Sequence, residues 1–514
     1  MTIKSPAHKP VYLKVKIIDI NVGDSRYVIV NDSDLKALHV KPLERVRLTR
    51  GAKSVTAHIL SSSTIVERGF IGLPKRVANE LGVGDGVTVG IRIMEMPPSI
   101  PYIKKKLKGL RLAPEEIRQI VKDTVDGMLD DVELAAFLTA ELFYGLTPEE
   151  MESLIRAMVD TGIKIEFEEP VYDEHSIGGV PGNSKVALLA VPTIAAAGLL
   201  IPKTSSRAIT SPAGTADTME VLARVDLTPE EIKEIAPKTK GLLVWGGALK
   251  MAPADDIFIR VLNRIMVDPR SQMVASILSK KLAMSVSTLV IDIPTGKGAK
   301  VTTMEEASKL AALFIEQGER LGIKVRCAVS YGSQPVGYSI GPALEAKEAL
   351  EALMGKGAMS LIAKAMGIAG LVFEEAGLAP KGQGERIAKE ILYSGRSLAK
   401  MREIIEAQGG NPNIKPDDIP VGDKVITIET PTDSYVTHVD NTAITLIARA
   451  AGAPEDKGAG VKIHVKAGSK VKAGDPLLTI YAESSVKLSQ AYSLATKLKP
   501  ITLEGMILKV IPEE

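Results

Sequence analysis

Residues 273–285 read MVASILSKKLAMS, and the apolar run TLVIDI follows at residues 288–293. The first segment spaces its apolar residues as one face of an α-helix does, and the second is short enough to be a buried strand. Two further pieces repeat this alternation, a helix in KVALLAVPTIAAAG (185–198) and a strand in VRCAVSYG (325–332). Helices that alternate with short apolar strands predict an α/β domain with a mixed, mostly parallel sheet. In such a domain the ligand lies at the loops that leave the carboxyl ends of the strands.

The segments that precede this domain have other patterns. Residues 10–96 contain alternating strands such as YLKVKIIDI, with one short helix that ends at Gly82. This part resembles the small swapped-hairpin barrels that serve as added domains, and we predict a role in assembly. Residues 103–168 space their apolar residues as helices do, and Thr147 with Glu150 forms the signature of a capped helix start.

The C-terminal part returns to strands, with an alternating hairpin in GVKIHVKAGSKVKAGDPLLTIYAE (460–483). The hairpin is similar to those of biotinyl and lipoyl carriers, but no lysine stands in a carrier-type turn, so we predict a structural role. The whole chain is therefore predicted to be a multidomain α/β protein. We expect a small β-rich barrel, a helical domain, the α/β domain and an α+β domain, with bounds 1–96, 97–170, 171–415 and 416–514.

Composition argues against several classes of function. The formal net charge of the 514 residues is +2 with both signs mixed, which disfavours a nucleic-acid coat or a polybasic membrane module. The single cysteine, Cys327, permits no disulfide, and the six histidines lack metal-ligand spacing. The first residues lack the apolar stretch of a secretory signal, and no apolar run reaches the roughly 18 residues of a membrane helix. We therefore expect a cytoplasmic protein without a bound metal.

The first candidate site is HSIGGVPGN (175–183), in which three glycines precede an apolar helix. Such a turn exposes backbone N–H groups, and the N-terminus of the helix adds positive potential. Together these features form a cradle for a phosphate group, although a plain turn with a helix cap is the alternative. The segment is not a Walker A loop, because no Gly-Lys-Ser/Thr sequence closes it.

The second candidate site is KTSSRAITSPAGTADTME (203–220), which is rich in hydroxyl groups and contains the guanidinium of Arg207. We expect Thr215 to cap the helix that begins at Ala216. Hydroxyl and N–H groups at this second helix start complete an anion site if the two segments meet.

The run SSRAITSPAGTADTMEVL (205–222) closely resembles the signature of the thymidine and pyrimidine-nucleoside phosphorylase family. Further matching pieces follow in the same order as in that family: HSIGGVPGN, GGALKMAPADD, ASILSKKLA and IDIPTGKGAKV. The resemblance spans residues 103–510 and is greatest to the archaeal branch that cleaves AMP, whose members carry an N-terminal extension of this size. It implies a pentosyltransferase without a cofactor. The expected reaction is phosphorolysis of AMP to free base and ribose 1,5-bisphosphate, with CMP and UMP left open as substrates.

The resemblance also implies roles for individual residues and an assembly. It assigns four residues to the phosphate site: Ser176, Gly179, Ser205 and Thr215. It gives the substrate site to a larger set: Gly179, Ser206, Arg207, Ala208, Ile209, Thr210, Ser211, Thr215, Ser276, Lys280 and Lys300. Asp268 is the expected proton donor to the leaving base, because it stands where nucleoside phosphorylases place contacts to a pyrimidine. The implied assembly is a homodimer or larger homo-oligomer formed through the helical and N-terminal domains.

One departure from the family concerns the phosphate site, and several alternatives stay open. Nucleoside phosphorylases have Lys-His-Ser before the glycines, whereas this chain has Glu174-His175-Ser176, so a phosphate-binding lysine is missing. His175 remains the alternative proton donor to Asp268, and Lys297 the alternative to Lys300 for a 5′-phosphate. The rival functions are a thymidine or pyrimidine nucleoside phosphorylase, an anthranilate phosphoribosyltransferase, and a DNA-binding or regulatory protein that uses the N-terminal barrel.

Overall fold

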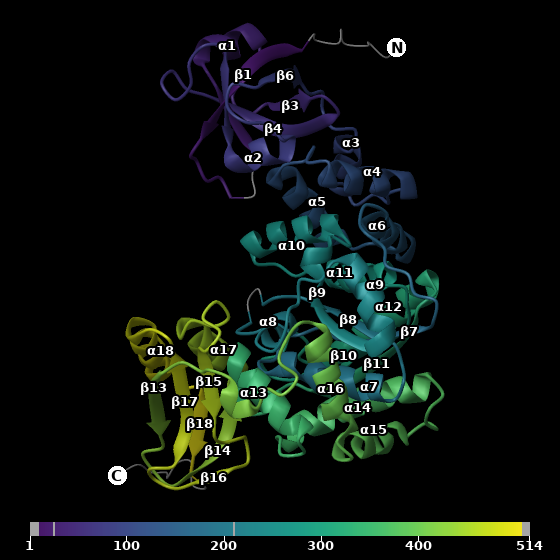
Figure 1. The fold of residues 1–514 in the computed structure, drawn as a ribbon, viewed down its shortest axis with the longest axis vertical. Helices are drawn as coiled ribbons and strands as arrows, with labels where there is room; N and C mark the ends of the chain where they lie inside the picture. The colour runs from purple at the N-terminus through teal and green to yellow at the C-terminus, as the bar shows by residue number, and fades with distance from the viewer. Residues whose placement is uncertain (1–9, 24–25, 209–210, 506–514) are drawn as a thin grey trace, which may run out of the picture. The chain divides into compact units, whose positions relative to one another are not determined.

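The computed structural model describes residues 10–23, 26–208 and 211–505 (Figure 1). By its internal contacts the chain divides into two compact units. The first unit comprises Met1–Thr161 and Pro253–Pro269, and the second comprises Gly162–Ala252 and Arg270–Glu514.

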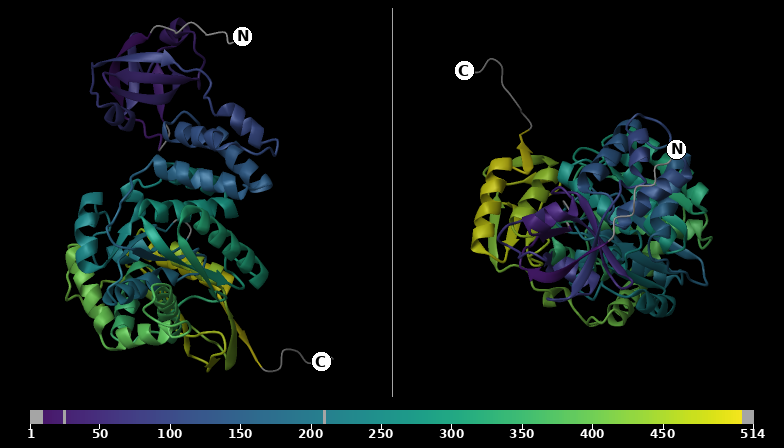
Figure 2. Two further views of the ribbon diagram at one scale, coloured as in Figure 1. Left: turned by 90° about the vertical axis from the view of Figure 1, so that its right-hand side faces the viewer. Right: turned by 90° about the horizontal axis from the view of Figure 1, so that it is seen from above.

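The first unit begins with a closed six-stranded barrel, in which the strands pair in the order β1-β5-β2-β4-β3-β6 (Figure 2). Leu13 and Val15 of β1 point inward while their neighbours are exposed, so the period-two pattern builds the barrel core. The helix predicted to end at Gly82 does so, with Gly82 at a φ of 70°. The strands are β1 (Val11–Ile18), β2 (Tyr27–Val30), β3 (Arg45–Arg50), β4 (Lys53–Ser61), β5 (Phe70–Pro74) and β6 (Thr88–Ile93), and the helices are α1 (Asp32–Leu38) and α2 (Lys75–Leu81).

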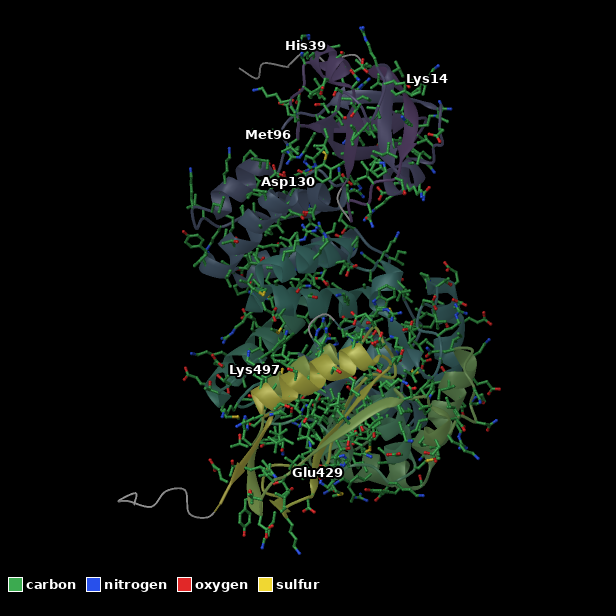
Figure 3. The ribbon with its side chains drawn as sticks, turned by 90° about the vertical axis from the view of Figure 1, so that its left-hand side faces the viewer. Lys14, His39, Met96, Asp130, Glu429 and Lys497 are labelled. Carbon is green, nitrogen blue, oxygen red and sulfur yellow. The ribbon has the colours of Figure 1, made fainter. Side chains whose placement is uncertain are left out.

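A helical bundle completes the first unit. Its helices are α3 (Ile100–Lys106), α4 (Pro114–Val125), α5 (Asp131–Tyr144), α6 (Pro148–Asp160) and α10 (Pro253–Ile265). The predicted capping box is present, since Thr147 Oγ1 accepts from the Glu150 N–H at 3.2 Å and a Glu150 carboxylate oxygen accepts from the Thr147 N–H at 2.8 Å. The barrel is tied to the bundle by Arg45 of β3, which bonds the carboxylates of Asp130, the N-cap of α5, and Glu133 in its first turn (Asp130 is labelled in Figure 3).

The second unit contains the predicted parallel sheet. Its strands are β7 (Val171–Ser176), β8 (Ile201–Ser205), β9 (Gly241–Trp245), β10 (Val286–Thr295) and β11 (Lys324–Tyr331). β10 pairs in parallel with both β7 and β11, and β8 pairs in parallel with β9. A parallel bridge from Val171 to Leu200 joins the two groups, so all five strands end on the same side.

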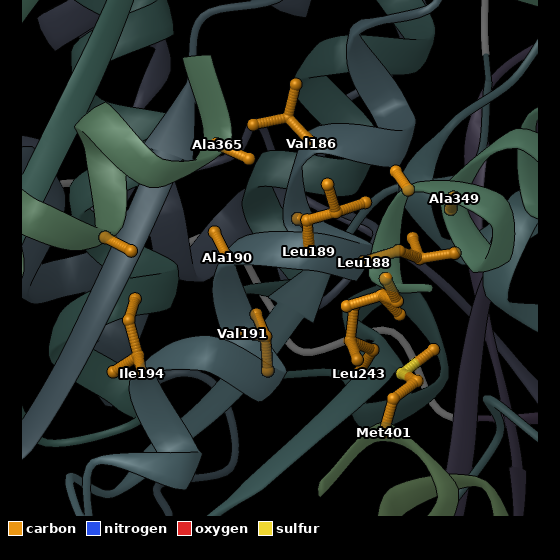
Figure 4. Close-up of a cluster of buried hydrophobic side chains, with 14 of the residues drawn as sticks. Val186, Leu188, Leu189, Ala190, Val191, Ile194, Leu243, Ala349, Ala365 and Met401 are labelled. Atoms are coloured by element: carbon orange, nitrogen blue, oxygen red, sulfur yellow. The ribbon is translucent and has the colours of Figure 1, made fainter. Parts of the chain in front are cut away.

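Helices cover this sheet and form the largest core of the molecule. They are α7 (Val186–Ala196), α8 (Thr215–Glu220), α9 (Pro229–Thr239), α11 (Arg270–Ala283), α12 (Met304–Leu321), α13 (Pro342–Leu353), α14 (Met359–Glu375), α15 (Gly384–Tyr393) and α16 (Arg396–Ala407). Helix α7 is apolar on all sides and lies at the centre, where Leu188 and Leu189 are fully buried with Leu243 of β9 and Met401 of α16 (Figure 4). A helix buried on every side is rigid, and its N-terminus follows the glycine-rich segment directly.

The C-terminal part of the second unit consists of antiparallel sheets and two helices. It contains β13 (Lys424–Glu429), β14 (Ser434–Val439), α17 (Asn441–Ala450), β15 (Gly460–Ile463), β16 (Lys470–Val471), β17 (Pro476–Ala482), α18 (Ser485–Leu498) and β18 (Ile501–Glu504). The sheet orders are β12-β15-β17-β13 and β16-β14-β18, where β12 (Ser339–Ile340) comes from the preceding part of the chain. Helix α18 packs against β17 and β13, and Figure 3 marks Lys497 on it. The predicted fold class, a barrel, a helical domain, an α/β domain and an α+β domain, is confirmed.

Candidate active site

The glycine-rich loop leaves the carboxyl end of β7, the position at which α/β domains bind their ligands. Ser176 ends the strand and its Oγ accepts from the Gly178 N–H at 3.3 Å. Gly178, Gly179 and Gly182 have φ values of 76°, 87° and 77°, a left-handed conformation that side chains rarely adopt. A short 3-10 helix and α7 follow at once. The loop therefore lies at a helix N-terminus, where backbone N–H groups favour an anion.

The second segment leaves the neighbouring strand, β8. Helix α8 begins at Thr215 with Gly214 as its N-cap, so the prediction that Thr215 caps the helix was wrong by one residue. The physical reason is Asp217, whose carboxylate accepts from the Gly214 N–H at 3.0 Å and from the Ala208 N–H at 2.7 Å. By bonding these two N–H groups, the carboxylate fixes Gly214 as the N-cap and folds the 206–208 segment back onto the start of the helix, while the Thr215 hydroxyl donates to the carbonyl of Ser184.

Two contacts bring predicted site residues together. The Thr215 hydroxyl donates to the carbonyl of Ser184 at 3.1 Å, which joins the second segment to the glycine-rich loop. Gly179 packs so closely on Lys300 that an added Cβ would stand 2.6 Å from Lys300 Cγ and 3.0 Å from its backbone nitrogen. The structure therefore places Gly179, Thr215 and Lys300 around one loop.

Other predicted residues of the second segment are engaged in contacts within the protein. Ser205 is buried and its hydroxyl donates to the carbonyl of Val244 at 3.2 Å. Arg207 bonds both oxygens of Glu220, contacts Asp217 at 3.2 Å and lies 4.7 Å from the centre of the Trp245 ring. Hydrogen bonding from Arg207 lowers the pKa of Glu220 to about 2, so this pair is ionised at neutral pH.

The remaining predicted residues are more dispersed. Ser206 is exposed, Ala208 and Ser211 are partly exposed, and Ile209 and Thr210 lie outside the described residues. On α11 the side chains of Ser276 and Lys280 lie on one face, with Lys280 Nζ 3.4 Å from Ser276 Oγ. Asp268 follows α10, belongs to the first unit and is exposed.

A buried ion network beside the glycine-rich loop was not foreseen from the sequence. It consists of Asp173 and Glu174 of β7, Lys203 of β8 and Lys281 of α11, and His175 of β7 lies against it. Lys281 Nζ bonds Asp173 at 2.6 Å, and Lys203 Nζ lies 3.4 Å from Asp173 Oδ1 and 3.3 Å from Glu174 Oε1. The available signal was Lys203, a charged residue in the middle of the short strand IPKTS, since a charged residue inside a sheet usually has a buried partner.

Burial controls the protonation of this network. Burial lowers the pKa of His175 well below its ordinary value, and the cations of Lys281, Lys203 and Lys280 lower it further, so the imidazole is neutral at neutral pH. Burial also lowers the pKa of Lys281 to about 8 against the opposing effect of Asp173. For Lys203 burial acts in the same direction, but the carboxylates of Asp173 and Glu174 outweigh it and raise the pKa.

Two properties of the described residues bear on the class of protein. Between residues 10 and 505, outside the gaps at 24–25 and 209–210, no cluster of three His, Cys, Asp or Glu side chains could hold a metal ion. Over the same residues no helix has the length and apolarity needed to span a membrane.

Comparison with known domain families agrees with this arrangement. Residues 100–162 match the helical bundle domain of the glycosyl transferase family, and residues 168–398 match its α/β domain. Residues 435–502 match the C-terminal domain of pyrimidine nucleoside phosphorylases. The fold and site thus define a pentosyltransferase enzyme.

Relatives that align over nearly the whole chain identify the family more specifically. The chain is 53% identical over 501 residues to the AMP phosphorylase of Hyperthermus butylicus, covering 97% of this chain and 99% of that protein. It is 53% identical over 500 residues to the AMP phosphorylase of Pyrococcus furiosus and 49% identical over 502 residues to that of Methanocaldococcus jannaschii, again covering 97% of this chain and 99% of each relative. The chain belongs to the AMP phosphorylase family.

A solved structure shows the same fold. The anthranilate phosphoribosyltransferase of Thermus thermophilus superposes with a TM-score of 0.51 at 21% identity, covering 60% of this chain and 98% of that one. At this identity the likeness concerns the fold only.

Proposed function

We propose that this enzyme uses inorganic phosphate to cleave the N-glycosidic bond of AMP, giving adenine and ribose 1,5-bisphosphate. The observation that carries the proposal is the joint placement of Gly179, Thr215 and Lys300 around a glycine-rich loop at a helix N-terminus. The relatives named AMP phosphorylase support the choice of substrate. CMP and UMP stay open as further substrates.

In this mechanism the loop around Ser176 and Gly179 binds phosphate, with Thr215 as a further contact. The N–H groups of the loop and the start of α7 hold the anion behind the anomeric carbon. The bond from that carbon to the base breaks through an oxocarbenium-like state while the bond to a phosphate oxygen forms. Ser205 is assigned to this site by the family resemblance, although its hydroxyl bonds Val244 in the structure.

The substrate is proposed to lie along the second segment, on the residues from Ser206 to Ser211, with α11 presenting Ser276 and Lys280 toward the base. Lys300 is proposed to bind the 5′-phosphate of AMP. It packs on Gly179 of the loop that is proposed to bind inorganic phosphate. Asp268 would give its proton to a ring nitrogen of the departing adenine. This carboxyl is exposed in the structure, and a general acid must lie within hydrogen-bond reach of the atom that receives its proton.

The test is base release from AMP, adenosine, CMP, UMP and thymidine, each with and without added phosphate. We expect release from AMP that requires phosphate and yields a ribose carrying two phosphates. Equal release in phosphate-free buffer would make the enzyme a hydrolase. A preference for thymidine or another nucleoside over AMP would favour the pyrimidine nucleoside phosphorylase alternative.

We also infer a cytoplasmic homodimer or larger homo-oligomer, assembled through the helical and N-terminal domains. Exposed apolar side chains on α5, including Val132 and Phe143 at 77% exposure each, support a contact surface on the helical domain. No nucleic acid is expected as a partner, because charges of both signs are mixed along the chain.

A further inference from the structure

The buried ion network is not used by any step of the proposed reaction. The side chains of Asp173, Glu174, Lys203 and Lys281 are at most 4% exposed. Buried ion pairs are weak contributors to stability, because removing both charges from water costs about as much as their attraction returns. A network of four such groups next to the glycine-rich loop therefore suggests a role in the site.

The contact that suggests this role joins Lys203 to His175. Lys203 Nζ lies 3.5 Å from His175 Nδ1, and it also donates to the backbone carbonyl of Glu174. An ammonium group has hydrogen atoms to donate and no lone pair to accept with. The contact is therefore a hydrogen bond only if Nδ1 of His175 is unprotonated. Since the imidazole is neutral, its one proton then lies on Nε2.

We propose that Lys203 is a positioning residue that fixes His175 as the neutral tautomer with its proton on Nε2, so that the ring offers an N–H donor to the phosphate bound by the adjacent loop. His175 directly precedes Ser176, whose hydroxyl orders the turn at Gly178. The ammonium of Lys203 thus acts on the loop through His175.

This assignment has a consequence for the proton donor. A neutral imidazole would have to become an imidazolate to give up its remaining proton, which is unfavourable at neutral pH. His175 is therefore a hydrogen-bond donor and not the acid that protonates the base. The part of the inference that concerns phosphate rests on the proposed function, whereas the tautomer does not.

The direct test is nitrogen NMR of the full-length protein labelled with 15N-histidine, with the His175 signals assigned from a His175→Gln variant. We expect an unprotonated Nδ1 and a protonated Nε2 between about pH 6 and pH 8, the range in which an ordinary histidine titrates. A proton on Nδ1, or an imidazolium at pH 7, would overturn the inference. This measurement needs no substitution of Lys203.

The variant test removes one cation and one anion together, so that the network stays neutral. In Lys203→Met with Glu174→Gln, we expect the KM for phosphate to rise roughly tenfold, the order expected for losing one oriented donor to an anion. Loss of the Lys203 cation should raise the pKa of His175, but burial and the cations of Lys281 and Lys280 still hold that pKa below its ordinary value, so the imidazole should stay neutral at neutral pH. Lys203→Arg retains a buried donor and should keep the tautomer.

The matched control is Lys106→Met with Glu150→Gln, which removes an ion pair of similar burial in the helical bundle that shares no partner with Lys203 or His175. It should leave the tautomer and the KM for phosphate nearly unchanged. Equal effects of the two double variants, with the tautomer intact in both, would show that Lys203 is only structural. If AMP cleavage proves independent of phosphate, the proposed function fails while the tautomer measurement still decides the role of Lys203.

Discussion

Gly179 shows how a single missing side chain shapes the site. Its backbone has a φ of 87°, and the space that a Cβ would need is filled by Lys300. We expect Gly179→Ala to push Lys300 away and to raise the KM values for phosphate and AMP by tenfold or more. The left-handed conformation itself costs an alanine about 1 to 2 kcal/mol of stability. Steady-state kinetics and thermal unfolding measure the two effects separately.

A glycine elsewhere in the same unit provides the control. Gly198 follows α7 with a φ of 89°, and nothing lies within 4 Å of the position that a Cβ would take there. Gly198→Ala should therefore lose a similar amount of stability and keep its KM values. If both variants lost activity in proportion to stability, the contact with Lys300 would have no specific role.

Asp268 is the residue on which the proposed acid catalysis depends. Asp268→Asn keeps the size of the side chain and removes the transferable proton. General acid catalysis contributes about 100- to 10,000-fold, so kcat on AMP should fall by that order while the KM changes little. A substrate whose base leaves without protonation should recover much of the rate. Normal turnover of AMP by the variant would assign Asp268 a structural role. The control is Asp226→Asn, which changes a carboxylate that is 65% exposed.

Single elements were predictable where local sequence determines them. The capping box at Thr147 and Glu150, the end of α2 at Gly82 and the strands β10 and β11 each follow from neighbours a few residues apart. The N-cap of α8 was misplaced because the carboxylate of Asp217 fixes the backbone of Gly214, and the Thr215 hydroxyl donates to Ser184, a residue outside the helix. The ion network escaped prediction because its members lie on β7, β8 and α11, whose packing no local pattern reveals.

Contacts from the C-terminal domain to the second segment (203–220) could not be predicted from local sequence either. Arg449 of α17 donates to the carbonyl of Ser211 at 3.1 Å, across 238 positions of sequence. Lys457 bonds Glu220 at 2.9 Å and Asp217 at 3.3 Å, the same carboxylates that hold Arg207. These contacts fix the second segment from outside its own domain.

Lys457→Met tests this fixing of the substrate segment. A partly exposed ion pair contributes up to about 1 kcal/mol, so the KM for AMP should rise about two- to fivefold while the KM for phosphate stays the same. Lys487→Met is the matched control, since Lys487 has similar exposure and bonds Asp456 at 2.6 Å without touching the segment. An equal change in both variants, or in both KM values of Lys457→Met, would contradict the expectation.

At the scale of the whole molecule, the N-terminal barrel has the features of an independent module. Its strands close on themselves and its core contains only its own side chains, so it presents no open sheet edge that needs a partner among the residues that the structure describes. Ionic contacts between the barrel and the helical bundle run through Arg45 and His58 to the carboxylates beside α5. A module attached by a few polar contacts can be removed without unfolding its neighbour.

We therefore expect removal of residues 1–96 to change the size of the assembly more than the chemistry of a single site. Light scattering should show a smaller particle, while the rate per site on AMP with phosphate stays within about threefold, since the predicted phosphate and substrate residues other than Asp268 lie in the second unit. Arg45→Gln in the full-length chain is the milder version, because it loosens the barrel without exposing the bundle. Unchanged stoichiometry together with lost chemistry would reverse the assignment and make the barrel part of the catalytic unit.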